Sequence, residues 1–446
     1  MSSVRRILRV RALRDVALAA ALAAGTLSPA LAQSLRELYE AARGYDASYL
    51  ASRALAASAE HRVAQSEALL KPSAALTAGA TATQLEFDRL GSGRQTTLQG
   101  ALSGRVPLLN DANRVSVEQA RRSLEVAQAD LQAAEQELIL RVAQAYFDVL
   151  AAQDALATAQ AGKTAIGEQL ASARRNFEVG TATITDTREA QARFDLATAQ
   201  ELAAQNDLRT KRIALDQLVG RTDVQPLPLK VPVVLPAVQP ADVQAWVEGS
   251  QRQHPLVRKA QVGLEVARLE TDKARAGQRP TLEAVGQLGA NRQTGSFATS
   301  PGSNGSASVG LQLNWPLWTG GAVQSRIQET LVLQDKAQQD LEAARRGVAQ
   351  GTRVAYFGVQ SGQAQVLALQ AAEASSLLAL QATQLGYKVG VRVNLDVLNA
   401  QTQLNQTQRD LARSRYEVLV GGLRLRQAAG QLSETDLHAV DALLGR

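Results

Sequence analysis

The chain has 446 residues, of which only 4% are aromatic although 45% are hydrophobic, so its apolar content is mostly Ala, Leu and Val and suits slim, closely packed helices. It has no cysteine, which excludes disulfides, thiolate metal sites and the lipid attachment of a bacterial lipoprotein. The formal charge of +6 is concentrated at the N-terminus, since residues 33–446 hold 43 basic and 41 acidic side chains. A nucleic-acid partner is therefore not expected.

The first 32 residues have the pattern of a cleaved signal peptide. Five arginines within residues 5–14 precede a short apolar stretch at residues 16–27, and Ala30-Leu31-Ala32 supplies small residues at the cleavage site. The apolar stretch is shorter than the roughly 20 residues that a spanning helix needs, which disfavours a membrane anchor. We expect an exported mature chain that begins at Gln33.

Each half of the chain starts with helical sequence and then changes to an alternating pattern. Residues 34–70 and 256–277 are helical in character and stop before Pro72 and Pro280. Apolar and polar residues then alternate, for example over residues 97–106 and 308–315, which predicts two strands of about ten residues in each half. Polar loops are expected between the paired strands, at residues 89–95 and 292–305.

Strands near ten residues with one apolar face have the length that crosses a bilayer in a tilted β-barrel. An amphipathic hairpin in a soluble domain has the same pattern, but the sequence offers such a hairpin no core to pack against. Because roughly eight strands are the lower limit for closing a membrane barrel, a chain with four such strands must oligomerise.

A long helix follows the strands in each half. No proline intervenes from residue 111 to 177, and Leu, Val and Ala recur there with the 3,4 spacing of a coiled coil. At 1.5 Å per residue this helix would be a rod of roughly 100 Å, far longer than a bilayer is thick. It ends at Val179-Gly180, and its counterpart ends at Val389-Gly390. Shorter helices are expected to run back over residues 184–219 and 394–429.

The two halves are copies of one unit, displaced by about 210 residues. Five prolines break the segment that joins the halves, so residues 221 to about 245 are expected to be extended. We divide the chain into a signal peptide (1–32), a first repeat (33–220), a Pro-rich connector (221–252), a second repeat (253–430) and a C-terminal tail (431–446). The matching segments are Ala145-Tyr146-Phe147 with Ala355-Tyr356-Phe357, Val106-Pro107-Leu108 with Trp315-Pro316-Leu317, Phe177-Glu178-Val179-Gly180 with Tyr387-Lys388-Val389-Gly390, Asp186 with Asp396, and Gly220 with Gly430.

With its signal peptide, its two strand-pair-plus-hairpin units and the run Gly386-Tyr387-Lys388-Val389-Gly390-Val391-Arg392-Val393-Asn394-Leu395-Asp396, the sequence resembles the TolC outer-membrane channel family. The resemblance implies an α+β membrane protein: a homotrimer with a shared 12-strand transmembrane β-barrel, in contact with outer-membrane lipid, and a long periplasmic α-helical barrel. It implies a passive exit duct for type I protein secretion or multidrug efflux. A periplasmic adaptor and an inner-membrane ABC or proton-driven pump would open the duct, and no cofactor is implied.

The resemblance also implies functional residues at the hairpin ends. Tyr387 and Arg392 match residues that tie the second hairpin to its neighbours, and Thr185 and Asp186 match their partners on the first hairpin. Asp396 matches an aspartate of a cation-binding constriction, and Asn399 stands where the family pattern has a second aspartate, so a weaker negative ring is expected. The adaptor would dock on the tips at Val179, Gly180, Val389 and Gly390. Without the resemblance, the charged residues at these helix starts would be interpreted as solvated charges.

Two other classes of protein fit the sequence less well. An enzyme is disfavoured because the three histidines are scattered and neither a His-Glu-x-x-His nor a Gly-x-Ser-x-Gly motif occurs. A periplasmic coiled-coil adaptor or scaffold would share the signal peptide and the helical hairpins, but it has no use for four strands of membrane length. The sequence does not identify the cargo, although the lack of a lipid-attachable cysteine favours the unlipidated members of the family, which include type I secretion channels.

Overall fold

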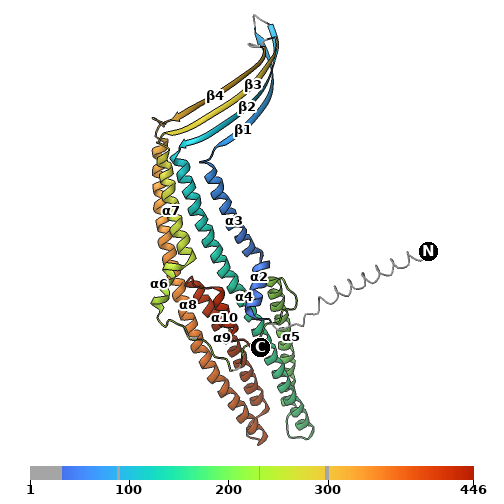
Figure 1. Ribbon diagram of the computed structural model, residues 1–446. Coiled ribbons are helices and arrows are strands. Elements are labelled where there is room, and N and C mark those ends of the chain that lie inside the picture. Colours follow the sequence, from blue (N-terminus) through green and yellow to red (C-terminus); the bar gives the residue numbers. More distant parts are fainter. Residues whose placement is uncertain (1–32, 88–90, 231, 297–300, 446) are drawn as a thin grey trace, which may run out of the picture.

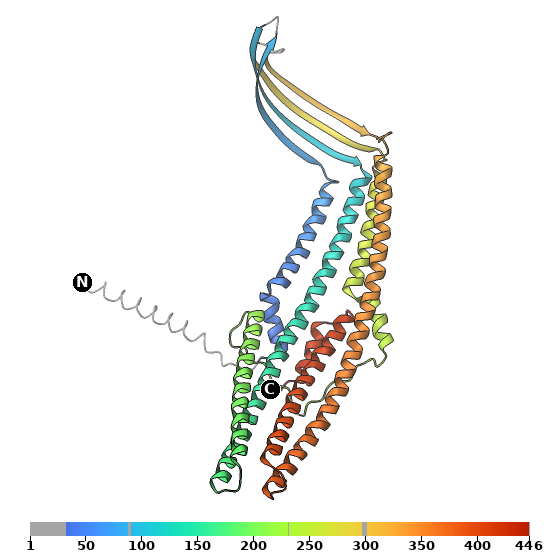
Figure 2. The ribbon, with the colours of Figure 1, turned by 180° about the vertical axis from the view of Figure 1, so that it is seen from behind.

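The computed structural model describes residues 33–445 except 88–90, 231 and 297–300, and the predicted signal peptide lies outside the described residues. The molecule is long and slim. A curved sheet forms one end, helices run from it along the molecule, and two helical hairpins form the other end (Figure 1). The view from behind shows the same division (Figure 2). No helix among the described residues is long and apolar enough to span a membrane.

One antiparallel sheet contains all four strands, in the order β1-β2-β3-β4. The strands are longer than the ten residues expected, and the two polar loops are correspondingly shorter, because the Gly-, Ser- and Thr-rich ends of the hairpins also pair. Pairing of β2 with β3 joins the two repeats, and the outer edges of β1 and β4 are open within the described chain. The strands are β1 (Ser73–Phe87), β2 (Gly91–Leu109), β3 (Thr281–Gly295) and β4 (Gly302–Asn314).

The register gives the sheet one apolar and one polar face, because residues paired across antiparallel strands point to the same side. Leu76 pairs with Leu102, Leu102 pairs with Leu288, and all three are at least 47% exposed. On the same face of β4, Val309 is 93% exposed. The opposite face carries Thr, Ser, Gln and Asn side chains and an ion pair between Arg105 and Glu283 at 3.3 Å. Neither face is covered by another of the described elements (Figure 1).

Two very long helices lead away from the sheet, and each turns back in a shorter helix, as predicted. The long helices are α4 (Asp111–Glu178) and α8 (Ala322–Lys388), and the returning helices are α5 (Ile184–Val219) and α9 (Asn394–Ala428). The side chain of Asn110 caps the start of α4, while Gly320 and Gly321 precede α8 with positive φ. At 1.5 Å per residue, α4 with its 68 residues is about 100 Å long.

The first helical stretch, expected to be continuous over residues 34–70, is instead broken into α2 (Leu35–Tyr45) and α3 (Ala47–Ala68). The break occurs at Asp46, whose carboxylate accepts a hydrogen bond from the Tyr49 amide at 2.8 Å and so caps α3. The same carboxylate accepts two hydrogen bonds from Arg141 of α4, at 2.9 and 3.2 Å. A helix start and a tertiary contact therefore share one residue.

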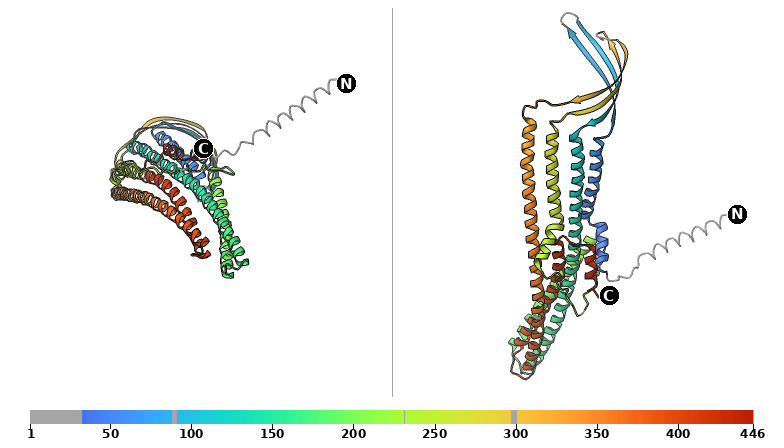
Figure 3. Two further views of the ribbon diagram at one scale, coloured as in Figure 1. Left: turned by 90° about the horizontal axis from the view of Figure 1, so that it is seen from below. Right: turned by 60° about the vertical axis from the view of Figure 1, so that its left-hand side comes forward.

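The segment between the repeats is not extended throughout, since its last part forms helix α6 (Val243–Gln253), followed by α7 (Pro255–Ala276). Trp246 of α6 is buried and packs beside Tyr356 of α8, which anchors the helix. Below the sheet, helices α3, α4, α7 and α8 run side by side in the same order as the strands above them (Figure 3). In the lower half the order is α5, α4, α9, α8.

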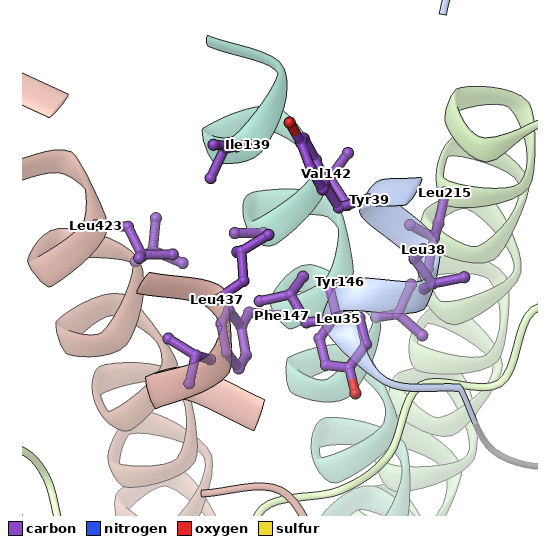
Figure 4. Packing of buried hydrophobic residues seen from close by; sticks show 14 of the residues in the cluster. Leu35, Leu38, Tyr39, Ile139, Val142, Tyr146, Phe147, Leu215, Leu423 and Leu437 are labelled. Atoms are coloured by element: carbon purple, nitrogen blue, oxygen red, sulfur yellow. The ribbon is translucent and has the colours of Figure 1, made fainter. Parts of the chain in front are cut away.

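The largest buried cluster lies where α2, α4, α9 and the short helix α10 (Glu434–Asp441) meet (Figure 4). Tyr146 and Phe147 of α4 are at most 1% exposed, and the Tyr146 hydroxyl donates to the backbone carbonyls of Gln33 and Leu227. The Asp441 carboxylate accepts a hydrogen bond from the Leu35 amide at 2.9 Å, so the C-terminal helix caps the first helix of the fold. Burial raises the pKa of this carboxyl above its ordinary value.

Candidate functional site

Both hairpins turn through the same backbone motif. Each long helix is followed by a valine as C-cap and then by a glycine in the left-handed region, Gly180 at φ 80° and Gly390 at φ 79°. In the first hairpin the Thr181 amide donates to the Asn176 carbonyl and the Gly180 amide donates to the Phe177 carbonyl. The second hairpin repeats this pattern, which is the Schellman motif. The two tips are therefore nearly identical hydrogen-bonded turns.

The tips expose apolar side chains. Val179 is 73% exposed, Val389 is 66% exposed and Val391 is 75% exposed. A Cβ atom added at Gly180 or Gly390 would meet no atom within 4 Å, so both turns are open to their surroundings. Exposed valines at two such turns, at the end of the molecule farthest from the sheet, suit contact with another protein.

On the first hairpin, the two predicted site residues lie in the first turn of α5. Thr185 is exposed. Asp186 forms a capping box, in which its carboxylate accepts from the Thr183 amide at 3.0 Å and its own amide donates to the Thr183 hydroxyl at 3.2 Å. This carboxylate therefore already has hydrogen-bond partners within its own hairpin.

On the second hairpin, Arg392 lies in the turn before α9 and forms an ion pair at 3.6 Å with Asp396 in the first turn of that helix. Because the Arg392 side chain is 62% exposed, this pair stabilises the structure only slightly. Tyr387 is half-buried and packs against a small cluster made by Leu380, Val397 and Leu404. The charge of Asp396 is thus partly compensated within its own chain.

Near the tips, the side-chain hydrogen bonds that join the two hairpins include two that involve predicted site residues. The Asn176 amide donates to the Tyr387 hydroxyl at 3.0 Å, and the Arg193 guanidinium donates to the Asn399 amide oxygen at 3.0 Å. Sequence reasoning missed Asn176 and Arg193, since neither belongs to a pattern that relates the hairpins. Leu398 of α9 is also fully buried in a cluster formed mainly by α4 and α5.

The structure brings together only some of the predicted site residues within one chain. Tyr387 and Asn399 contact the first hairpin, but through Asn176 and Arg193 rather than through Thr185 or Asp186. Arg392 and Asp396 pair with each other. Among the described residues, no group of three His, Cys, Asp or Glu side chains is placed to hold a metal ion. The predicted site residues therefore take part in side-chain contacts between helices and within the second hairpin.

The model of the family described as outer membrane efflux protein matches residues 38–221 and 246–431, one match to each repeat. The chain belongs to this family. It is 33% identical to the outer membrane protein TolC of Vibrio cholerae over 428 residues, which cover 94% of this chain and 96% of that protein. It is also 34% identical to the alkaline protease secretion protein AprF of Pseudomonas aeruginosa, over 69% of this chain and 64% of that protein.

Solved structures agree in fold. The outer membrane protein VceC of Vibrio cholerae superposes with a TM-score of 0.74 at 20% identity, covering 89% of this chain and 96% of that one. The open state of the MtrE outer membrane channel of Neisseria gonorrhoeae gives a TM-score of 0.70 at 21% identity, covering 90% of each chain. The predicted family is therefore confirmed, together with the outer membrane location and the role of an exit duct for secretion or efflux. A coiled-coil adaptor is not favoured, and the family is one of transport ducts rather than of enzymes.

Proposed function

We propose that three copies of this chain close one 12-stranded barrel in the outer membrane and continue it as a helical barrel across the periplasm. The observation that supports this most directly is the sheet, which has an exposed apolar face, a polar face and two open edges. Four strands are too few to close a membrane barrel, and an exposed apolar strand surface is stable only against lipid or protein. A barrel closed by three copies would pair the open strand edges and place the apolar face against lipid.

The side-chain hydrogen bonds between the two hairpins support a gate at the end of this tube that is far from the sheet. In the proposal, Tyr387, Arg392, Thr185, Asp186, Asp396 and Asn399 line or hold the narrow end, with Asn176 and Arg193 added as partners inside each chain. Asp186 and Arg392 would exchange their present partners for groups on the neighbouring copy when the tube is closed. These contacts are individually weak, so a docked machine can break them.

The exposed tips support docking of a periplasmic adaptor, with Val179, Gly180, Val389 and Gly390 at the contact. The adaptor would connect the duct to an inner-membrane ABC or proton-driven pump. The duct itself would supply only a path, and its polar sheet face would line the watery part of that path.

The test is to extract the protein in mild detergent and compare unheated with boiled samples by gel electrophoresis, and then to record currents in planar bilayers. We expect a heat-sensitive trimer that forms channels. A protein that is monomeric before heating contradicts the shared barrel, and a trimer without conductance contradicts the duct.

The cargo is either a secreted protein or a small toxic compound, and relatives of both kinds are found. The alkaline protease secretion protein AprF is 34% identical, and the outer membrane efflux protein BepC of Brucella suis is 28% identical. We propose type I secretion as the first candidate, following the lack of cysteine. Deleting the gene and measuring both the secreted proteins and the sensitivity to toxic compounds separates the two, since loss of one secreted protein with unchanged sensitivity supports secretion.

A further inference from the structure

The two repeats adopt the same local geometry at equivalent positions. The rings of Tyr146 and Phe147 lie 5.5 Å apart at an interplanar angle of 78°, and those of Tyr356 and Phe357 lie 5.5 Å apart at 84°. Each long helix ends in the same glycine turn. A residue in α4 or α5 therefore has a structural counterpart 210 positions later in α8 or α9.

The order of the elements shows how the first repeat meets the second. Contacts run from β2 to β3, from α4 to α7 and from α4 to α9. If a neighbouring copy repeats these contacts, β4 and α8 of one copy lie against β1, α3 and α5 of the next. These are the elements that lie on the two outer edges of the molecule, on opposite sides (Figure 1). This contact between copies is heterologous, and a rotation that returns to its start closes it as a ring.

Exposure identifies two positions that are buried inside the chain and bare at its edges. Phe147 of α4 and Leu423 of α9 share the large buried cluster and are 1% and 3% exposed (Figure 4). Their counterparts Phe357 of α8 and Ile213 of α5 are 54% and 59% exposed. The same pair of positions is therefore buried between repeats and bare on both outer edges.

A hollow on the outer edge of α5 has the place that this contact requires. It has a volume of about 690 Å³ and a mixed lining, in which leucines and Ile213 alternate with polar and charged side chains: Leu156, Leu202, Gln205, Asn206, Leu208, Arg209, Arg212, Ile213, Asp216 and Asp223. Asn206 is the counterpart of Tyr416, whose ring lies 5.8 Å from the ring of Phe147. A phenylalanine that entered the hollow would thus meet the residues that correspond to the neighbours of Phe147.

Charged residues on the helices next to the sheet support the same arrangement of copies. The Gln119 amide of α4 donates to Glu270 of α7 at 2.9 Å. Helices α3 and α7 correspond with an offset of 208, as Pro72 and Pro280 show, so the counterparts of these two residues are Glu329 and Arg62. An acidic residue on one edge would face a basic residue on the other, which favours this register over a slipped one.

From these correspondences we infer that Phe357 of one copy occupies the hollow lined by Leu202, Asn206, Arg209 and Ile213 on α5 of the next copy, so that the contact between copies repeats the α4–α9 contact inside each chain. The inference rests on the proposed trimer and specifies its interface. It predicts which residues meet, which the existence of a trimer alone does not.

A cysteine pair tests this register, because the chain has no cysteine of its own. Helices α4 and α9 approach closely at Gly162, where an added Cβ would lie 2.3 Å from the Asn405 side chain. The counterparts are Ala372 of α8 and Asp195 of α5, both exposed in one chain. We expect the double variant Ala372→Cys, Asp195→Cys to form covalent dimers and trimers on mild oxidation, with most chains linked.

Three matched variants interpret that result. The pair Gly162→Cys, Asn405→Cys should link within single chains. Replacing the α8 position by Ala374→Cys, about 200° round the helix, should give no link with Asp195→Cys. Phe357→Ala should lower the temperature at which the unheated trimer dissociates, while Leu367→Ala should not, because Leu367 and its counterpart Ala157 are both exposed.

One gel distinguishes failure of the proposed register from failure of the proposed trimer. A heat-sensitive trimer that does not link through Ala372→Cys and Asp195→Cys, or that links equally through Ala374→Cys, overturns the register and leaves the trimer standing. A protein that runs as a monomer before heating overturns the trimer itself, and the register with it.

Discussion

Two glycines with nearly the same backbone angle allow the cost of crowding to be separated from the cost of conformation. Gly430 follows α9 with φ 70°, and Gly390 follows α8 with φ 79°. A Cβ atom at Gly430 would lie 2.5 Å from the Cα atom of His254, whereas a Cβ atom at Gly390 would meet nothing within 4 Å. Replacement by alanine therefore imposes the same left-handed conformation at both sites but crowds the backbone at only one.

The expected magnitudes follow from these distances. The left-handed conformation costs an alanine about 1–2 kcal/mol at either position. Overpacking adds about 1–3 kcal/mol at Gly430, because the obstructing atom belongs to the backbone and no side-chain rotation can relieve it. We expect Gly390→Ala to lower the free energy of unfolding by about 1–2 kcal/mol, and Gly430→Ala to lower it by about 2–5 kcal/mol.

The assay is urea unfolding of the purified protein in detergent, followed by circular dichroism, with both variants measured beside the parent. Gly44→Ala is the control, since Gly44 lies inside α2 with no atom within 4 Å of its added Cβ, and alanine favours a helix. Equal losses for Gly430→Ala and Gly390→Ala would refute the reasoning, because the close approach to His254 would then have no energetic weight.

Three further outcomes are expected. Burial alone would raise the pKa of Asp46, but hydrogen bonds from Arg141 and from a backbone amide outweigh it and hold the pKa below its ordinary value. The ion pair therefore stabilises the fold at neutral pH and loses this effect as the pH falls below about 4. We expect Asp46→Asn to flatten the acid unfolding curve in that range. Tyr387→Phe removes the acceptor of the Asn176 hydrogen bond, worth about 1 kcal/mol per chain, and should raise the open fraction of single channels in planar bilayers; an unchanged open fraction contradicts the gate. Asn399→Asp combined with Arg193→Gln should strengthen block of the channel by multivalent cations in the same recordings, because Arg193, which now donates to Asn399, would otherwise pair with the new carboxylate; equal block in parent and variant argues against a constriction at this position.

Local patterns were sufficient to predict the helices and their turns. The long helices could be bounded because proline is absent inside them and a glycine follows each one, and α4 and α5 begin and end within a residue or so of the predicted limits. The strand lengths were underestimated, since Gly, Ser and Thr near the hairpin ends have the composition of loops yet pair regularly in the sheet.

What the sequence concealed depends on tertiary contacts. The break at Asp46 was missed because an aspartate is tolerated inside a helix, and only its contacts with Tyr49 and Arg141 show that it starts a new one. The partner of Tyr387 was missed for the same reason, since Asn176 lies 211 positions away on another helix. The resemblance singled out candidate residues at the tips, but it did not predict which of them meet inside one chain.

The cap that Asp441 provides to the start of α2 has a consequence for how the chain matures. The two residues are separated by 406 positions, so the amides of Leu35 and Arg36 find this partner only after nearly the whole chain has been synthesised and has crossed the inner membrane. A product that ended before Asp441 would leave the amides of Leu35 and Arg36 without this partner, and only the capping box of Ser34 and Glu37 would remain at the start of α2. A chain cut short at its C-terminus should therefore be less stable at its distant N-terminal helix, and more open to proteases, than the full-length chain.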